Sequence, residues 1–238
     1  GSASINRCEG VRQGGGGRRQ VSRARRPGRV TSWPARQSES RRVLIRRQLA
    51  LTPDDIVQLP SGIWITTELR TAMDCCVVLS HEAAVCLLDA GLHQKQFSHD
   101  QLREQVALRA GMPGVRAQER AVDAADGRSE SAAESLTRLL LLPWLPGLVP
   151  QWKLREQNDR IVARFDLGDP AAKFAIETDG RRGHEGKAMA AKDHARDRRT
   201  GAWGWKTERV TWFDIRCRPA ETVARVLAAH RRLVGKAA

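Results

Sequence analysis

The sequence predicts an α/β protein: a basic N-terminal arm, a small mixed α/β domain, and a C-terminal domain in the order α-β-β-β-α-β. Three observations predict it. Residues 1–30 scatter arginines around four consecutive glycines, residues 31–125 pass from short β-branched pieces to amphipathic repeats, and residues 126–238 interleave helix and strand patterns. With 41% hydrophobic and 29% charged residues, the chain has the balance of a soluble protein.

The arm is the most basic part of the chain. Residues 1–50 hold thirteen arginines and two glutamates, a charge of +11, so the other 188 residues carry about +3 of the total +14. Residues 1–30 have too few apolar side chains to offset the entropy of ordering, which predicts disorder. A polyanion, nucleic acid above all, is the expected partner. The alternative is a tail that only aids solubility.

The small domain, residues 31–125, begins with strand-like pieces in "RRVLIRRQLAL" and "IVQLPSGIWITT". Helical patterns follow at 67–79, 81–90, 99–110 and 114–125, with Gly91 and Gly111 placed to end the second and third. The apolar helix at 81–90 belongs to the core or, alternatively, forms an interface with a partner protein or a second copy of the chain.

The C-terminal domain, residues 126–238, opens with a helix. Ser131 and Glu134 form an S-x-x-E capping box, and Pro143 ends the helix. The remaining patterns predict strands at about 151–155, 160–167, 173–179 and 206–213, and helices at 187–200 and 219–234. Three tryptophans of this domain are expected in the core: Trp203, Trp205 and Trp212.

Three acids fall within two of these strands. Glu177 and Asp179 are two residues apart and therefore share a face, and the "GDPA" turn can return the chain so that Asp166 lies beside them. Two carboxylates ~4 Å apart repel by roughly 4 kcal/mol at an effective dielectric near 20. Mg²⁺ or Mn²⁺ would resolve that repulsion. The alternative is pairing of these acids with arginines, namely Arg164, Arg181 or Arg182.

These residues resemble the PD-(D/E)XK nuclease superfamily, and more closely the actinobacterial endonuclease-like proteins related to very-short-patch-repair endonucleases. The resemblance rests on "RSESAAESLTRLLL", "IVARFDLGDPAAKFAIETDGRRGH", "ARDRR" and "WGWKTERVTWFDI", and covers about residues 126–235. Upstream, "RQSESRRVLIRRQLALTPDDIV" is similar to proteins with an abortive-infection-antitoxin-like region, whose N-terminal winged helix is expected to be missing or degenerate in this sequence.

The resemblance implies a restriction-endonuclease-like fold and a Mg²⁺- or Mn²⁺-dependent endonuclease acting on DNA, in repair or phage defence. It implies that Asp166 and Glu177 hold the metal. Asp179, at the position of the superfamily's lysine, would be a further ligand or orient water. His184 would transfer protons, and Glu134 is the helix acid of the pattern.

A cation to replace the missing lysine could come from Lys173, Lys187 or Lys192. The basic residues expected to contact nucleic acid are Arg181, Arg182, Lys187, Lys192, Arg196, Arg198 and Arg199. The alternative function is a catalytically weak or inactive DNA-binding or regulatory, antitoxin-like protein on a nuclease scaffold. Without an apolar leader or a run long enough to span a bilayer, the expected location is cytoplasmic, away from membranes.

Overall fold

The computed structural model describes residues 51–179 and 196–235. The chain divides into two units, residues 1–65 and residues 66–238. The predicted arm, residues 1–30, and the strand predicted in "RRVLIRRQLAL" lie outside the described residues, apart from Leu51. The helices of the described ranges include none long and apolar enough to cross a membrane.

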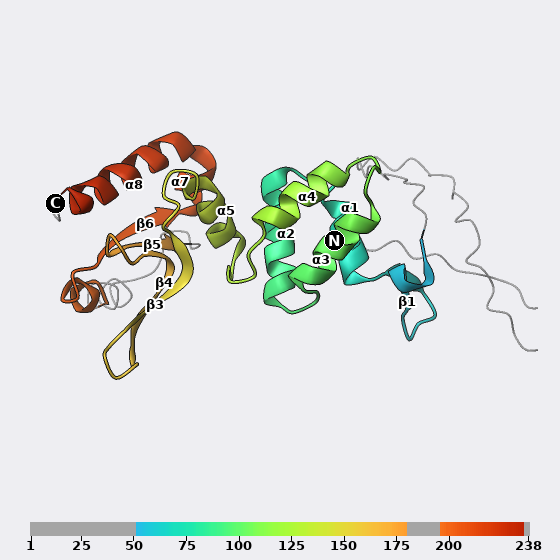
Figure 1. Ribbon diagram of the computed structural model, residues 1–238, viewed down its shortest axis with the longest axis horizontal. Coiled ribbons are helices and arrows are strands. Elements are labelled where there is room, and N and C mark those ends of the chain that lie inside the picture. The colour runs from blue at the N-terminus through green and yellow to red at the C-terminus, as the bar shows by residue number, and fades with distance from the viewer. Residues whose placement is uncertain (1–50, 180–195, 236–238) are drawn as a thin grey trace, which may run out of the picture. The chain divides into compact units, whose positions relative to one another are not determined.

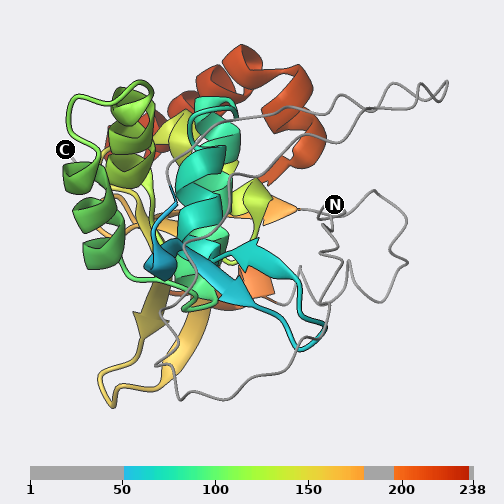
Figure 2. The same ribbon diagram turned by 90° about the vertical axis from the view of Figure 1, so that its right-hand side faces the viewer.

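The described part of the first unit centres on a small hairpin. A 3₁₀ turn, Pro53–Asp55, leads into β1 (Ile56–Gln58), which pairs with β2 (Trp64–Thr66), as Figure 2 shows in blue and cyan. Gly62 adopts a φ of +81° in the connecting turn, a conformation that favours glycine. The strand predicted in "IVQLPSGIWITT" is therefore confirmed as two short strands.

The second unit begins with four helices around their own core. They are α1 (Glu68–Cys75), α2 (His81–His93), α3 (His99–Leu108) and α4 (Val115–Ala124). Met73, Val85, Leu88 and Leu102 are fully buried among them, so the apolar face of α2 is a core face. These helices share their unit with the sheet that follows, and the boundary predicted near residue 125 stays a prediction of the sequence.

Gly91 does not end α2 as predicted, because the helix continues to His93. The glycine is required by packing. A Cβ at position 91 would lie 2.1 Å from Cζ of Phe97, so the missing side chain is what admits that ring. Gly111 follows α3 with a φ of +79°, the left-handed conformation expected of a glycine after a helix.

The sheet has the order β3-β4-β5-β6. The first two pairings are antiparallel and the last is parallel. Its strands are β3 (Val149–Arg155), β4 (Ile161–Asp169), β5 (Phe174–Asp179) and β6 (Lys206–Thr211). Preceded by α5 (Ala132–Leu141) and with residues 196–201 helical before β6, these elements confirm the predicted α-β-β-β-α-β order.

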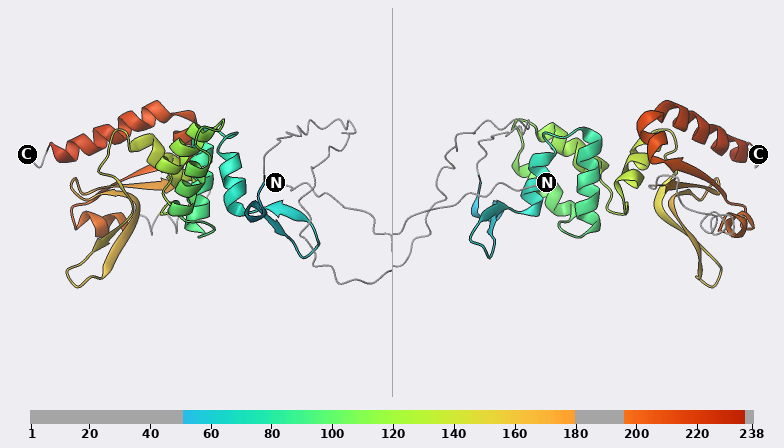
Figure 3. Two further views of the ribbon diagram at one scale, coloured as in Figure 1. Left: turned by 45° about the vertical axis from the view of Figure 1, so that its right-hand side comes forward. Right: turned by 180° about the vertical axis from the view of Figure 1, so that it is seen from behind.

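Two further helices complete the unit, α7 (Trp212–Cys217) and α8 (Pro219–Val234). Helices α5, α7 and α8 cover one face of the sheet, where Leu141, Phe174, Ile176 and Val226 are fully buried (Figures 1 and 3). The prediction of a strand to residue 213 is wrong. Thr211 and Asp214 form a reciprocal capping box that ends β6 and starts α7.

The opposite face of the sheet carries a smaller core. Phe165 and Trp205 stack there at 4.9 Å between ring centroids, with Ala163 and Ala175 buried beside them. Trp205 is 7% exposed, which confirms its predicted place in the core, whereas Trp203 is 39% exposed and Trp212 is 46% exposed. The prediction for those two tryptophans is wrong.

Candidate active site

Asp166 and Glu177 lie on neighbouring strands. The antiparallel pairing of β4 with β5 runs from Asp169–Phe174 to Leu167–Ile176, and Asp166 and Glu177 are the next residue of each strand beyond the last pair. There the main-chain N–H of Thr178 donates to Oδ2 of Asp166 at 2.7 Å. The carboxylate thus accepts a backbone hydrogen bond from the neighbouring strand. The two acids lie near enough for the charge of Asp166 to raise the pKa of Glu177, while the predicted trio with Asp179 stays a prediction.

Strand β4 changes its packing at Asp166. Phe165 belongs to the core on one face of the sheet and Leu167 to the core on the other, although a regular strand sends residues two apart to the same face. In β3, the residue opposite Asp166 by register is Gln151, which has a φ of +53°. Such local irregularity is common beside functional sites, where it re-aims a side chain.

Arg196 forms an ion pair with the other carboxylate, that of Glu177. Its Nη2 lies 2.6 Å from Oε1 of Glu177, and its Nη1 donates to Oε2 at 3.3 Å. Nη2 also donates to the main-chain carbonyl of Arg164, and the guanidinium lies 5.8 Å from the ring centroid of Phe165. Glu177 therefore pairs with an arginine, but with Arg196, which the sequence assigns to nucleic acid, and not with an arginine named in the alternative.

Arg164, the arginine of the predicted alternative that lies within the described residues, has another partner. Arg164 makes a two-fold ion pair with Glu130, at 2.6 and 2.9 Å. It therefore does not neutralise Asp166 by direct contact. Arg181 and Arg182 lie outside the described residues.

Both acids resist ionisation. Burial raises the pKa of Glu177 to about 7, with a further increase from the charge of Asp166, against the opposing effects of Arg196 and Arg209. Burial also raises the pKa of Asp166; the hydrogen bond from Thr178 opposes that shift and the charge of Glu134 adds to it. Two desolvated carboxylates side by side are an arrangement that a bound cation would stabilise.

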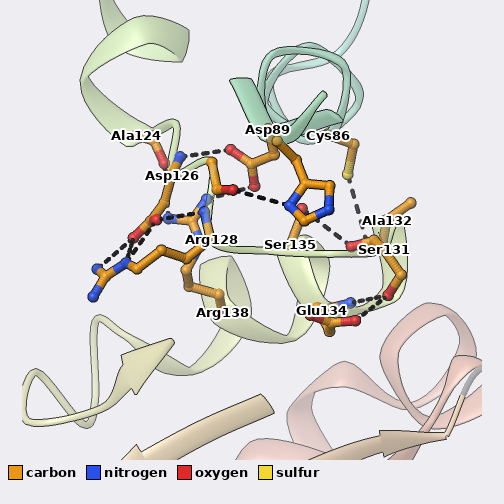
Figure 4. Close-up of polar contacts among 12 residues, drawn as sticks. Cys86, Asp89, Ala124, Asp126, Arg128, Ser131, Ala132, Glu134, Ser135 and Arg138 are labelled. Carbon is orange, nitrogen blue, oxygen red and sulfur yellow. Dashed lines mark hydrogen bonds and ion pairs between the residues drawn. The ribbon is translucent and has the colours of Figure 1, made fainter. Parts of the chain in front are cut away.

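Glu134 caps α5 and also contacts the sheet. Ser131 Oγ accepts from the N–H of Glu134 and donates to its Oε1 at 2.8 Å, as Figure 4 shows, so the predicted capping box forms on the serine side only. Its Oε2 accepts from Gln151 Nε2 at 2.8 Å and from the main-chain N–H of Glu130 at 2.9 Å. Through Gln151 the helix acid is joined to the strand position that faces Asp166.

A buried polar cluster, which the sequence did not reveal, fixes α5 against α2 (Figure 4). Arg138 of α5 pairs with Asp89 of α2 at 2.9 Å, with 5% and 1% of the two side chains exposed. Arg138 also donates to the carbonyl of Ala124, and the N–H of Asp126 donates to Asp89. This cluster holds the helix that carries Glu134.

The other predicted site residues are more dispersed. Asp179 is exposed at the end of β5 and pairs in register with Thr211; its part in the site stays a prediction. Lys173 precedes Glu177 by four residues, about 13 Å along the strand, and its Nζ donates to the carbonyl of Trp203. Lys173 therefore does not take the place of the superfamily's lysine. Arg198 and Arg199 are exposed. His184, Lys187 and Lys192 lie outside the described residues.

The donor chemistry fits a hard divalent cation. Mg²⁺ binds through one or two carboxylates together with water and phosphate oxygens, and Asp166 and Glu177 supply such a pair. Within residues 51–179 and 196–235, no three His, Cys, Asp or Glu side chains form a metal-binding group. The described residues therefore fit a site with two protein carboxylates, in which Arg196 competes for Glu177.

Comparison with known proteins gives relatives without an assigned role. Two uncharacterized proteins of Mycobacterium tuberculosis, from strains CDC 1551 and H37Rv, are each 28% identical over 171 residues, which is 71% of this chain. The match spans 63% of the length of each relative. No family model matches the chain. No solved structure matches it either.

Proposed function

We propose that the protein is a divalent-metal-dependent nuclease that hydrolyses phosphodiester bonds, with Asp166 and Glu177 as metal ligands. The observation that carries the proposal is the pairing of these two half-buried acids across β4 and β5, each with a raised pKa. A fold that only needed stability would gain by replacing such a pair with apolar residues, because burying like charges together is unfavourable. DNA is the proposed substrate, following the resemblance to repair endonucleases.

Three residues around Asp166 support the proposed metal site. The N–H of Thr178 fixes the carboxylate of Asp166. Gln151 joins Glu134 to the same strand position, and Glu134 adds negative potential around Asp166. A bound Mg²⁺ or Mn²⁺ supplies a Lewis acid that polarises the phosphodiester and lowers the pKa of a water.

Arg196 would also bind the substrate. If Glu177 were to hold a cation, the guanidinium would have to leave Oε1 and Oε2, two of its present partners. A guanidinium released beside a metal site can bind a phosphate oxygen through two hydrogen bonds. Arg198 and Arg199, exposed on the same helical segment, would contact the nucleic-acid backbone without reading sequence.

The alternative is a nucleic-acid-binding or regulatory protein with little or no cleavage activity. One observation favours it: Arg196 already neutralises Glu177. The charge of +11 in residues 1–50 would serve binding in either case.

Cleavage assays separate the two functions. The 238-residue chain is incubated with plasmid DNA and with a structured RNA, each in the presence of Mg²⁺, Mn²⁺ or EDTA. The nuclease reading predicts metal-dependent cleavage that Asp166→Asn reduces at least about 100-fold, a loss typical of a missing catalytic group. Asp159→Asn, which makes the same change at an exposed turn, should cleave normally. Binding without cleavage in either metal would favour the alternative.

A further inference from the structure

Two large aromatic side chains are exposed just beyond the end of β6, the strand that pairs with the acid-bearing β5. Trp212 is 46% exposed and Phe213 is 55% exposed, at the first two positions of α7. This helix buries Ile215 in the core beneath the sheet, and its capping box fixes the orientation of the first turn. Adjacent exposed aromatics form an apolar surface patch of the kind that marks an interaction site.

The sheet register places this aromatic pair at the end of the acid-bearing strand. Strands β5 and β6 are parallel, with Glu177 paired to Arg209 and Asp179 paired to Thr211. Trp212 follows Thr211 directly, so the aromatic pair begins one residue beyond the position that faces Asp179. The carboxyl ends of parallel strands are where α/β proteins commonly bind ligands.

One arginine contacts the aromatic pair and another lies on the same helix. The guanidinium carbon of Arg218 lies 5.3 Å from the ring centroid of Phe213, and Arg216 is exposed on the same helix. Arg218 also faces Glu221, but at 3.9 Å with both side chains largely exposed. The acid within α7, Asp214, is engaged by Thr211 and lies 3.5 Å from Arg225. Aromatic rings next to arginines are the composition of surfaces on which nucleobases stack.

We propose that Trp212 and Phe213 form a stacking platform for an unpaired base, which makes single-stranded or locally unpaired nucleic acid the preferred ligand. Arg216 and Arg218 would contact the flanking phosphates. This preference for unpaired strands goes beyond the proposed function. It rests on that function only for the identity of the ligand as nucleic acid. Base stacking needs a free aromatic face, which a fully paired duplex does not offer except at its ends.

Binding, measured without metal, tests the platform separately from cleavage. Fluorescence anisotropy in EDTA measures the affinity of the 238-residue chain for labelled oligo-dT and for a labelled hairpin duplex. The salt concentration is about 0.3 M, which screens the charges of the N-terminal arginines. Trp212→Ala should weaken oligo-dT binding by about 10-fold or more and duplex binding by less than about 3-fold. Trp212→Phe should restore most of the affinity, because it keeps an aromatic face.

Trp144→Ala is the matched control, since this tryptophan is 60% exposed on the segment between α5 and β3. It should leave both affinities unchanged. Equal affinities of wild type and Trp212→Ala for oligo-dT would overturn the platform. The platform would also be overturned if light scattering showed that Trp212→Ala dissociates a dimer while the affinity for oligo-dT stays unchanged. The aromatic pair would then be an interface between copies of the chain. A wild type that binds through Trp212 but never cleaves leaves the platform intact and overturns only the nuclease.

Discussion

Arg196 and Glu177 form an ion pair at 2.6 Å, and this pair occupies one of the two carboxylates that converge between β4 and β5. The guanidinium reduces the charge repulsion between Glu177 and Asp166, as a metal ion would. The resting state of the site is therefore a protein-supplied cation on a carboxylate pair, and binding of a divalent ion requires that this cation leave. The first prediction follows from that competition.

Removal of the competing guanidinium should strengthen metal binding. Arg196→Ala removes the guanidinium that contacts Glu177, so the Mn²⁺ affinity measured by titration calorimetry should rise several-fold. The free energy of unfolding should fall by about 1–2 kcal/mol, because the ion pair is only partly buried. Arg198→Ala, at an exposed position two residues away, should change neither quantity. An Mn²⁺ affinity that falls in Arg196→Ala would show that the arginine does not compete.

Stability should depend on pH through Glu177. Because burial raises its pKa to about 7 from 4.5, the folded chain holds a proton in this interval that the unfolded chain has released. The free energy of unfolding therefore falls as the pH rises from about 4.5 to about 7. Glu177→Gln keeps the neutral form, so relative to wild type it should gain on the order of 2 kcal/mol across that window.

Urea denaturation at pH 5, 6, 7 and 8 measures this difference. Glu119→Gln, at an exposed position of α4, is the control and should follow wild type at each pH. A constant offset between Glu177→Gln and wild type over the whole range would contradict the raised pKa.

Asp169 should matter for stability and not for metal binding. Its buried carboxylate accepts from the N–H groups of Ala171 and Ala172 and lies 2.9 Å from His230 Nε2 of α8. Asp169→Ala should therefore lower the free energy of unfolding by about 2–4 kcal/mol, the range for losing a buried hydrogen-bonded network. Thermal denaturation checks the loss. Mn²⁺ affinity below the melting temperature should match wild type; a large decrease would place Asp169 in the metal site.

The Asp89–Arg138 pair should be the most sensitive link between α2 and α5. Arg138→Met leaves Asp89 buried and charged without its partner, which should lower the free energy of unfolding by about 3–5 kcal/mol. The comparison is Arg103→Met, in an ion pair with Asp100 whose side chains are 66% and 95% exposed, where the change should stay below about 0.5 kcal/mol. Chemical denaturation of both variants measures the contrast.

The sequence revealed those features that depend on local pattern. The strand spacing and the "GDPA" turn were enough to predict the antiparallel pairing of β4 with β5, which brings Asp166 and Glu177 to the same end of the ladder, because an antiparallel turn fixes the register of its two strands. The contact of Ser131 with Glu134 at the start of α5 was equally local. A similar signal, Thr211 with Asp214 three residues later, was present but was not used, so α7 and its exposed aromatics were missed.

Features that depend on distant contacts could not be predicted in the same way. Nothing in the run "ARDRR" distinguishes Arg196, which reaches Glu177 and Phe165, from Arg198 and Arg199, which are exposed. The extension of α2 past Gly91 depends on where the ring of Phe97 packs. Such contacts are set by the tertiary fold, which local propensity does not encode.

Diffraction from crystals soaked in Mn²⁺ tests the central claim most directly, because the anomalous signal of manganese locates the ion without relying on activity. The account predicts a peak between the carboxylates of Asp166 and Glu177, with the guanidinium of Arg196 displaced from Oε1 of Glu177. Saturating Mn²⁺ with no peak at these carboxylates, and with Arg196 still paired to Glu177, would contradict the account.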